Sequence, residues 1–142
     1  MKGRGIMKYK RSELRYKIMT ILYQISLYNK NNINYDIDDV INEQLEIKND
    51  FVNDIVKGVI ENLDNIDTTA NKYLDKWRID RLGFTDQAIL RMAIYELMYT
   101  DTPDLVCINE AIELAKKYSD DKVVKMINGV LDKIYNSRLN NE

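Results

Sequence analysis

Apolar residues recur every three or four positions along most of the chain, which is the spacing of one buried face of an α-helix. The pattern predicts a first helix over residues 11–28, whose inward positions are Leu14, Ile18, Ile21, Leu22 and Ile25. The asparagine-rich segment 29–35 predicts a loop. After it, Asp36 or Asp38 can cap a short second helix that ends near Leu45.

The same spacing predicts five further helices in the rest of the chain. The third covers about residues 51–63, and the fourth extends from Ile66 to an inward-facing Trp77. A turn at 80–84 precedes a fifth helix that Thr85 or Asp86 caps, with Tyr99 among its inward positions. Pro103 then breaks the chain, and two helices follow. The sixth has Val106 facing inward and ends near Tyr118; the seventh starts at Asp120 or Asp121, and residues 136–142 are predicted to fray.

Seven helices joined by loops of a few residues predict an all-α fold, in which two sub-bundles of helices pack together. The chain holds one proline and five glycines, too few turn residues for a many-stranded sheet. We expect residues 11–142 to form a single helical domain that follows a basic arm, residues 1–10.

Composition narrows the class of protein further. A chain of 142 residues can bury a stable core without disulfides or metal. Cys107 is the one cysteine, which excludes an intramolecular disulfide and fits a reducing compartment. No stretch approaches the roughly 20 apolar residues that cross a bilayer, and the basic N-terminal stretch lacks the apolar run of a signal peptide. We therefore expect a cytoplasmic protein that makes no membrane contact.

The chain contains no histidine, so an imidazole general base and histidine-ligated zinc or iron sites are excluded. Cys107 consequently has no histidine to activate it as a nucleophile. The sequence also lacks a glycine-rich phosphate loop of the GxxxxGK type. These features predict a non-enzymatic binding protein that carries no cofactor or metal.

Charge is distributed unevenly, although the net charge is only −2. In residues 1–17 seven Lys and Arg side chains face one Glu, which gives +6. In residues 36–67 ten Asp and Glu side chains face two Lys, which gives −8. Such polarity can steer a polyanion to one end of the molecule. A basic tail without a function is the alternative, and charge alone leaves both open.

Two segments go beyond generic helical pattern. The first is residues 86–97, DQAILRMAIYEL; the second is residues 108–118, INEAIELAKKY, followed by NGVLDK at 128–133. In this order and spacing they resemble the C-terminal signature of the NusB family. The pair Arg11 and Arg15, followed by Leu22-Tyr23-Gln24, resembles that family's first helix. The resemblance covers the chain from Met7 onward.

The resemblance implies seven helices in two sub-bundles and a role in transcription antitermination by RNA polymerase. It also implies two partners: the small-subunit ribosomal protein NusE, and the boxA element of nascent ribosomal RNA, bound as a single strand. Some relatives self-associate, so a homodimer is a further expectation, and the family has no catalytic residues or cofactor. The alternative is a protein–protein adaptor of the same fold with weak RNA affinity. Ser12 and Glu13, which interrupt the basic cluster, motivate that alternative.

The predicted RNA contacts combine cations with stacking side chains. Phosphates need a row of cations, and arginine adds a two-pronged hydrogen-bonding group. Helical spacing puts Arg11 and Arg15 on one side of the first helix. Tyr23 can stack on an unpaired base or simply cover the core. Together with the positions that the resemblance implies, the set is Lys8, Lys10, Arg11, Arg15, Tyr23, Lys122, Lys125 and Met126.

Several polar positions look structural instead. Asn109 and Asn128 resemble buried asparagines of the family, whose amides must find hydrogen-bond partners. Arg91 and Glu96 could form a partly buried bond or contact a partner, and the sequence does not decide between these. Gly129 is expected to allow two helices to approach closely, and Cys107 to act as a small apolar residue.

Overall fold

The computed structural model describes residues 9–140, so Lys8 and most of the predicted basic arm lie outside the described residues. The described part consists of seven α-helices and one short 3-10 helix, without strands, which confirms the predicted all-α class. The helices are α1 (Arg11–Lys30), α2 (Ile37–Gln44), α3 (Asp50–Glu61), α4 (Leu63–Tyr73), α5 (Phe84–Tyr99), α6 (Asp104–Tyr118) and α7 (Asp121–Asn140), with η1 (Ile79–Arg81) before α5.

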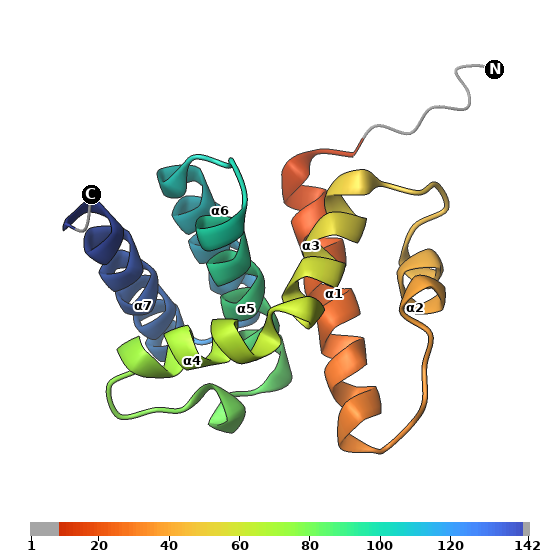
Figure 1. Ribbon diagram of the computed structural model, residues 1–142, viewed down its shortest axis with the longest axis horizontal. Helices are drawn as coiled ribbons and strands as arrows, with labels where there is room; N and C mark the ends of the chain where they lie inside the picture. The colour runs from red at the N-terminus through yellow and green to blue at the C-terminus, as the bar shows by residue number, and fades with distance from the viewer. Residues whose placement is uncertain (1–8, 141–142) are drawn as a thin grey trace.

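The helices gather in two groups (Figure 1), with α1, α2 and α3 on one side and α4 to α7 on the other. Helix α5 joins the groups, because it packs against α1 and α3 as well as against α4, α6 and α7. A helix surrounded on most sides must be apolar on most sides. This explains why α5 buries nine residues, among them Ile89, Leu90, Met92, Ile94 and Leu97.

Three side chains that the apolar pattern placed inside are exposed instead: Trp77, Tyr99 and Val106. For Trp77 the reason is local. Helix α4 ends at Tyr73, where the N–H of Leu74 closes the last turn on the Ala70 carbonyl. Beyond that turn the helical spacing no longer applies, and Leu74 and Ile79 fill the core in its place.

The predicted fraying after residue 136 is also wrong, because α7 remains helical as far as Asn140. The guanidinium of Arg138 holds this last part of α7 against the other helices. It donates to the Leu97 carbonyl at the end of α5 and lies 3.3 Å from Asp104 Oδ1 at the start of α6. Contacts with elements distant in sequence therefore extend this helix.

Two of the glycines differ in what surrounds them. At Gly58 of α3, an added Cβ would lie 2.2 Å from the ring of Tyr95 on α5, so the missing side chain allows this close approach. At Gly129 of α7 an added Cβ would meet nothing within 4 Å. The expectation that Gly129 permits close helix packing is therefore wrong, and Gly58 has that role.

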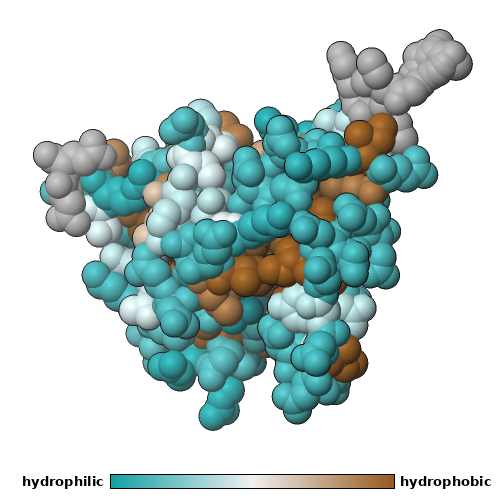
Figure 2. Space-filling model, turned by 45° about the vertical axis from the view of Figure 1, so that its right-hand side comes forward, coloured by the Kyte–Doolittle hydropathy of each residue, from teal (hydrophilic) through white to brown (hydrophobic). Residues whose placement is uncertain are grey.

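The face seen in Figure 2 is mostly hydrophilic, and apolar side chains surface near its centre. Within residues 9–140, none of the helices is both long and apolar enough to pass through a bilayer.

We expect Gly58→Ala to destabilise the protein by about 1–3 kcal/mol, because the Tyr95 ring must swing away from its packed position. Gly129→Ala is the matched control and should stabilise α7 by about 1 kcal/mol through helix propensity. Urea denaturation measures both. In a Tyr95→Ala background the penalty at Gly58 should vanish; a penalty that persists there would refute the steric explanation.

Candidate nucleic-acid interface

The two arginines in the first turns of α1 both lie over the Phe51 ring, but Arg15 is buried and Arg11 is exposed. The Arg15 side chain is 4% exposed and forms a two-pronged ion pair with Glu96 of α5, with N···O distances of 2.8 and 2.6 Å. Glu110 of α6 lies 3.5 Å from the same guanidinium. Burial by itself lowers the pKa of Arg15, but the hydrogen bond and charge of Glu96 outweigh it and raise the pKa above its ordinary value.

This pair corrects one prediction and decides an open question. Sequence spacing put Arg11 and Arg15 on one side of the helix, and both guanidinium groups do lie over Phe51. The predicted RNA contact of Arg15 is what the structure corrects, because this side chain is buried against α5. An RNA contact by Arg15 would require breaking the ion pair. Of the two interpretations of Glu96, the structure shows the buried bond, since its side chain is only 2% exposed. Arg91 also forms such a bond, donating twice to Asp67 at 2.9 Å.

Arg11, in contrast, lies on the surface. Its guanidinium stacks over Phe51 at the start of α3, 4.0 Å from the ring centroid. Next to it Lys10 is exposed, and the Lys10 backbone N–H donates to Glu13 Oε1 at 2.9 Å. Glu13 therefore satisfies a backbone donor at the first turn of α1. This contact gives the acidic residue within the basic cluster a structural role.

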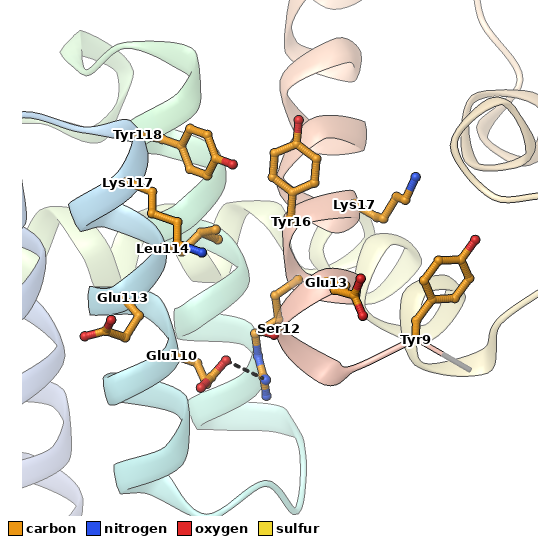
Figure 3. Close-up of a pocket in the computed structure, with 11 residues that line it drawn as sticks. Tyr9, Ser12, Glu13, Tyr16, Lys17, Glu110, Glu113, Leu114, Lys117 and Tyr118 are labelled. Atoms are coloured by element: carbon orange, nitrogen blue, oxygen red, sulfur yellow. Dashed lines mark hydrogen bonds and ion pairs between the residues drawn. The ribbon is translucent and has the colours of Figure 1, made fainter. Parts of the chain in front are cut away.

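A groove of about 390 Å³ runs between α1 and α6 (Figure 3). The rings of Tyr16 and Tyr118 face each other across it with centroids 5.4 Å apart, and they are 41% and 47% exposed. Lys17 and Lys117 line the groove as well. So do three carboxylates, Glu13, Glu110 and Glu113.

Sequence reasoning missed this groove, because α1 and α6 are brought together only by folding. One signal was present: Tyr16 and Tyr23 lie seven residues apart, which places them on one side of the first helix. Tyr23 itself is half-exposed, and its ring meets Phe84 of α5 edge-on at 6.3 Å. It therefore covers part of the core and also presents a surface, so both of its predicted roles stay open.

The start of α7 carries the second group of predicted contacts. Lys122 and Lys125 are exposed, and Met126 is half-buried against the core. The helix begins at Asp121, one of the two predicted starts, and the Asp120 Oδ1 caps it by accepting from the Val123 N–H at 2.9 Å. Within the described residues, no carboxylate forms an ion pair with Arg11, Lys122 or Lys125.

Two asparagines that the sequence predicted to be buried lie on the surface instead. Asn109 and Asn128 are both exposed, so neither is a buried amide. Their neighbours Ile108 and Ile127 point into the core instead, and each asparagine consequently turns outward. The short sequence signature identified the helices correctly, but it did not fix which side of each helix is covered.

Cys107 is buried at 1% exposure, close to Glu96 and Arg15. Burial raises the pKa of its thiol to about 12, and the charge of Glu96 adds to this effect. The thiol is thus an uncharged, small core group, as expected. Over residues 9–140, no cluster of three or more cysteine or acidic side chains is arranged to hold a metal ion.

Comparison with known proteins identifies the family. The family model described as the NusB family matches residues 12–136. The chain belongs to the NusB family. This family consists of non-enzymatic transcription factors, so the NusB chain is not an enzyme.

Relatives support this assignment over most of the chain. The transcription antitermination protein NusB of Campylobacter jejuni strain RM1221 is 40% identical over 131 residues, 90% of this chain and 97% of that protein. The protein of the same name from Listeria innocua is 41% identical over 126 residues, 88% and 95% of the two chains.

Solved structures agree with the fold. T. maritima NusB superposes with a TM-score of 0.77 at 34% identity, covering 90% of this chain and 92% of that chain. A chain from the crystal structure of antitermination factors NusB and NusE in complex with double-stranded RNA superposes with a TM-score of 0.75 at 27% identity, covering 89% and 96%.

Removing one partner of the Arg15–Glu96 pair should destabilise the protein by about 3–5 kcal/mol, because the other charge stays buried. Arg15→Met and Glu96→Met each test this by urea denaturation. The double variant should recover most of the loss. Lys57→Met, which breaks an exposed pair with Asp38 on α2, is the control and should change little. A double variant as unstable as the two losses added together would contradict a charge-pairing explanation.

The Cys107 pKa predicts a dependence of stability on pH. A thiol whose pKa rises from 9.0 to about 12 on folding favours the folded state fully below pH 9. Above pH 9 the unfolded thiol loses its proton first, so stability falls by up to about 1.4 kcal/mol per pH unit. Urea denaturation up to about pH 10.5 should show a steeper fall for the natural chain than for Cys107→Ala. Equal slopes would show that the folded thiol ionises normally.

Proposed function

We propose that this NusB chain is a cytoplasmic transcription antitermination factor that binds a boxA-type single strand of RNA together with the ribosomal protein NusE. The names of its relatives support the antitermination role. The similar chain in the complex of NusB, NusE and double-stranded RNA supports NusE and RNA as partners. Cytoplasmic location follows from the proposed role, since bacterial transcription takes place there.

One observation carries the proposal: exposed cations without acidic partners lie at two places on the described surface. Lys10 and Arg11 lie at the start of α1, and Lys122 and Lys125 at the start of α7. RNA binding draws most of its affinity from such cations, because each phosphate contact releases condensed counterions. Arg11 is also held in place by Phe51, which reduces the entropy lost when it binds a phosphate.

The α1–α6 groove offers a path between these groups. Tyr16 and Tyr118 present partly exposed rings, on which unpaired bases can stack. Glu13, Glu110 and Glu113 would repel phosphates, so the backbone would follow the side of Lys17 and Lys117. An RNA strand whose bases face the two tyrosine rings and whose phosphates face Lys17 and Lys117 fits this placement of charges.

A protein–protein adaptor with weak RNA affinity is the second candidate, and the burial of Arg15 favours it. The ion pair with Glu96 occupies a cation that the sequence assigned to RNA. The basic cluster on the described part of α1 is therefore thinner than the sequence indicated. The two candidates differ in whether RNA still binds selectively when NusE is present.

The test is RNA binding by the full chain, with and without NusE, at two salt concentrations. Fluorescence anisotropy of a labelled boxA-type strand and of a scrambled strand gives affinity and selectivity. We expect Arg11→Ala, and Lys122→Ala with Lys125→Ala, to weaken binding. Each phosphate that a variant no longer neutralises should lower the salt slope by about 0.7. Lys57→Ala, on α3, is the control and should leave both unchanged.

Binding to NusE without preference for the boxA-type strand would support the adaptor instead. Unchanged affinity and salt slope in both basic variants would move the RNA site to another surface.

A further inference from the structure

Trp77 is the chain's one tryptophan, and its side chain is 44% exposed in the turn between α4 and η1. The apolar pattern placed it in the core, but the end of α4 at Tyr73 leaves the ring on the surface. Its sequence neighbours Lys76 and Arg78 are exposed as well. The turn thus presents an aromatic ring between two cations.

The turn that carries Trp77 is fixed to the core at both ends. Leu74 and Ile79 are buried on either side of it. The Trp77 backbone N–H donates to the Leu74 carbonyl at 2.6 Å, and the Ile79 N–H donates to Asn71 Oδ1 at 2.8 Å. Fixed ends hold the turn in one conformation, so the indole is displayed on the surface by a defined loop.

Helix α7 adds a third cation to this surface. The ammonium of Lys122 lies over the indole, 5.3 Å from the ring centroid. Met126 follows one turn later on the same helix. A methionine side chain has no ring and so stacks poorly on a base. Arg78 forms an ion pair with Asp80, at 3.6 Å and with both side chains largely exposed, so this pair is weak.

We propose that Trp77 is a stacking platform for an unpaired base of the bound RNA, with Lys76, Arg78 and Lys122 contacting the adjacent phosphates. This inference rests on the proposed RNA-binding function and assigns one contact within it. Every base has a π face, so an exposed indole can stack on a single strand whatever its sequence. The ring would supply at the start of α7 the aromatic surface that Met126 lacks.

The surroundings of the ring favour RNA over a protein partner. The buried centres of protein–protein interfaces are depleted of charged residues, and an aromatic anchor there fits among apolar neighbours. Around Trp77 the exposed neighbours are Lys76, Arg78 and Lys122, with Asp75 and Asp80 in the same turn. An aromatic ring beside cations is the combination found where proteins hold single-stranded nucleic acid.

The experiment measures anisotropy of a labelled boxA-type strand in the presence of NusE for Trp77→Leu, Trp77→Phe and the natural chain. We expect Trp77→Leu to weaken binding about tenfold, which is the loss of one base stack. Trp77→Phe, which keeps a ring, should recover most of the affinity. Tyr99→Leu removes a comparably exposed ring at the C-terminal end of α5 and should leave RNA binding unchanged.

Intrinsic fluorescence gives an independent readout. The emission difference between complexes of the natural chain and of Trp77→Phe isolates the signal of Trp77, whatever NusE contributes. We expect the single strand to quench it and a fully paired RNA duplex of the same sequence to leave it unchanged, because paired bases cannot stack on the ring. Circular dichroism of each variant checks that the fold is intact.

The outcomes separate this inference from the function on which it rests. If the natural chain with NusE binds no RNA, the proposed function fails. If it binds RNA but Trp77→Leu binds equally well and the emission does not change, only the role of Trp77 is overturned. A loss of NusE affinity in Trp77→Leu without RNA would also overturn it, because Trp77 would then be a protein contact.

Discussion

The buried pair between Arg15 and Glu96 is the constraint on which the arrangement of the two helix groups depends. It joins α1 to α5 across a separation of 81 residues in sequence, and Glu110 of α6 adds a weaker contact to the same guanidinium. Two charges removed from water are tolerated only when they are well paired. The pair therefore specifies how α1 seats on α5, and it fixes α1 close to α6, where the groove forms.

The cationic side chains of this fold are divided between buried ion pairs and the exposed surface, where RNA could reach them. Arg15 is buried in an ion pair with Glu96, whereas Arg11 is exposed and its guanidinium stacks over Phe51. At the start of α7, Lys122 remains outside and lies over Trp77. The molecule thus combines exposed cations with fixed aromatic rings at both places. Proteins that bind single strands use this combination, because cations supply affinity and rings hold unpaired bases.

Aromatic side chains have two separate roles in this structure. Tyr95 fits the space left by Gly58, and so lets α3 and α5 approach closely. Tyr16, Tyr118 and Trp77 keep a large part of their rings exposed. Sequence periodicity alone cannot separate these two kinds of ring, because both can occur at helical spacing. A turn that ends a helix early, as at Leu74, is enough to move a ring from core to surface.

The sequence by itself determined the all-α class, the order and approximate bounds of seven helices, and the family. These features depend on local spacing and on side chains only a few residues apart. It did not determine that Arg15 is buried, that Asn109 and Asn128 face outward, or that Gly58 rather than Gly129 allows a close approach. Each depends on which distant helix covers a given face, and only tertiary packing decides that. The groove between Tyr16 and Tyr118 has the same origin, since its two walls meet only after folding.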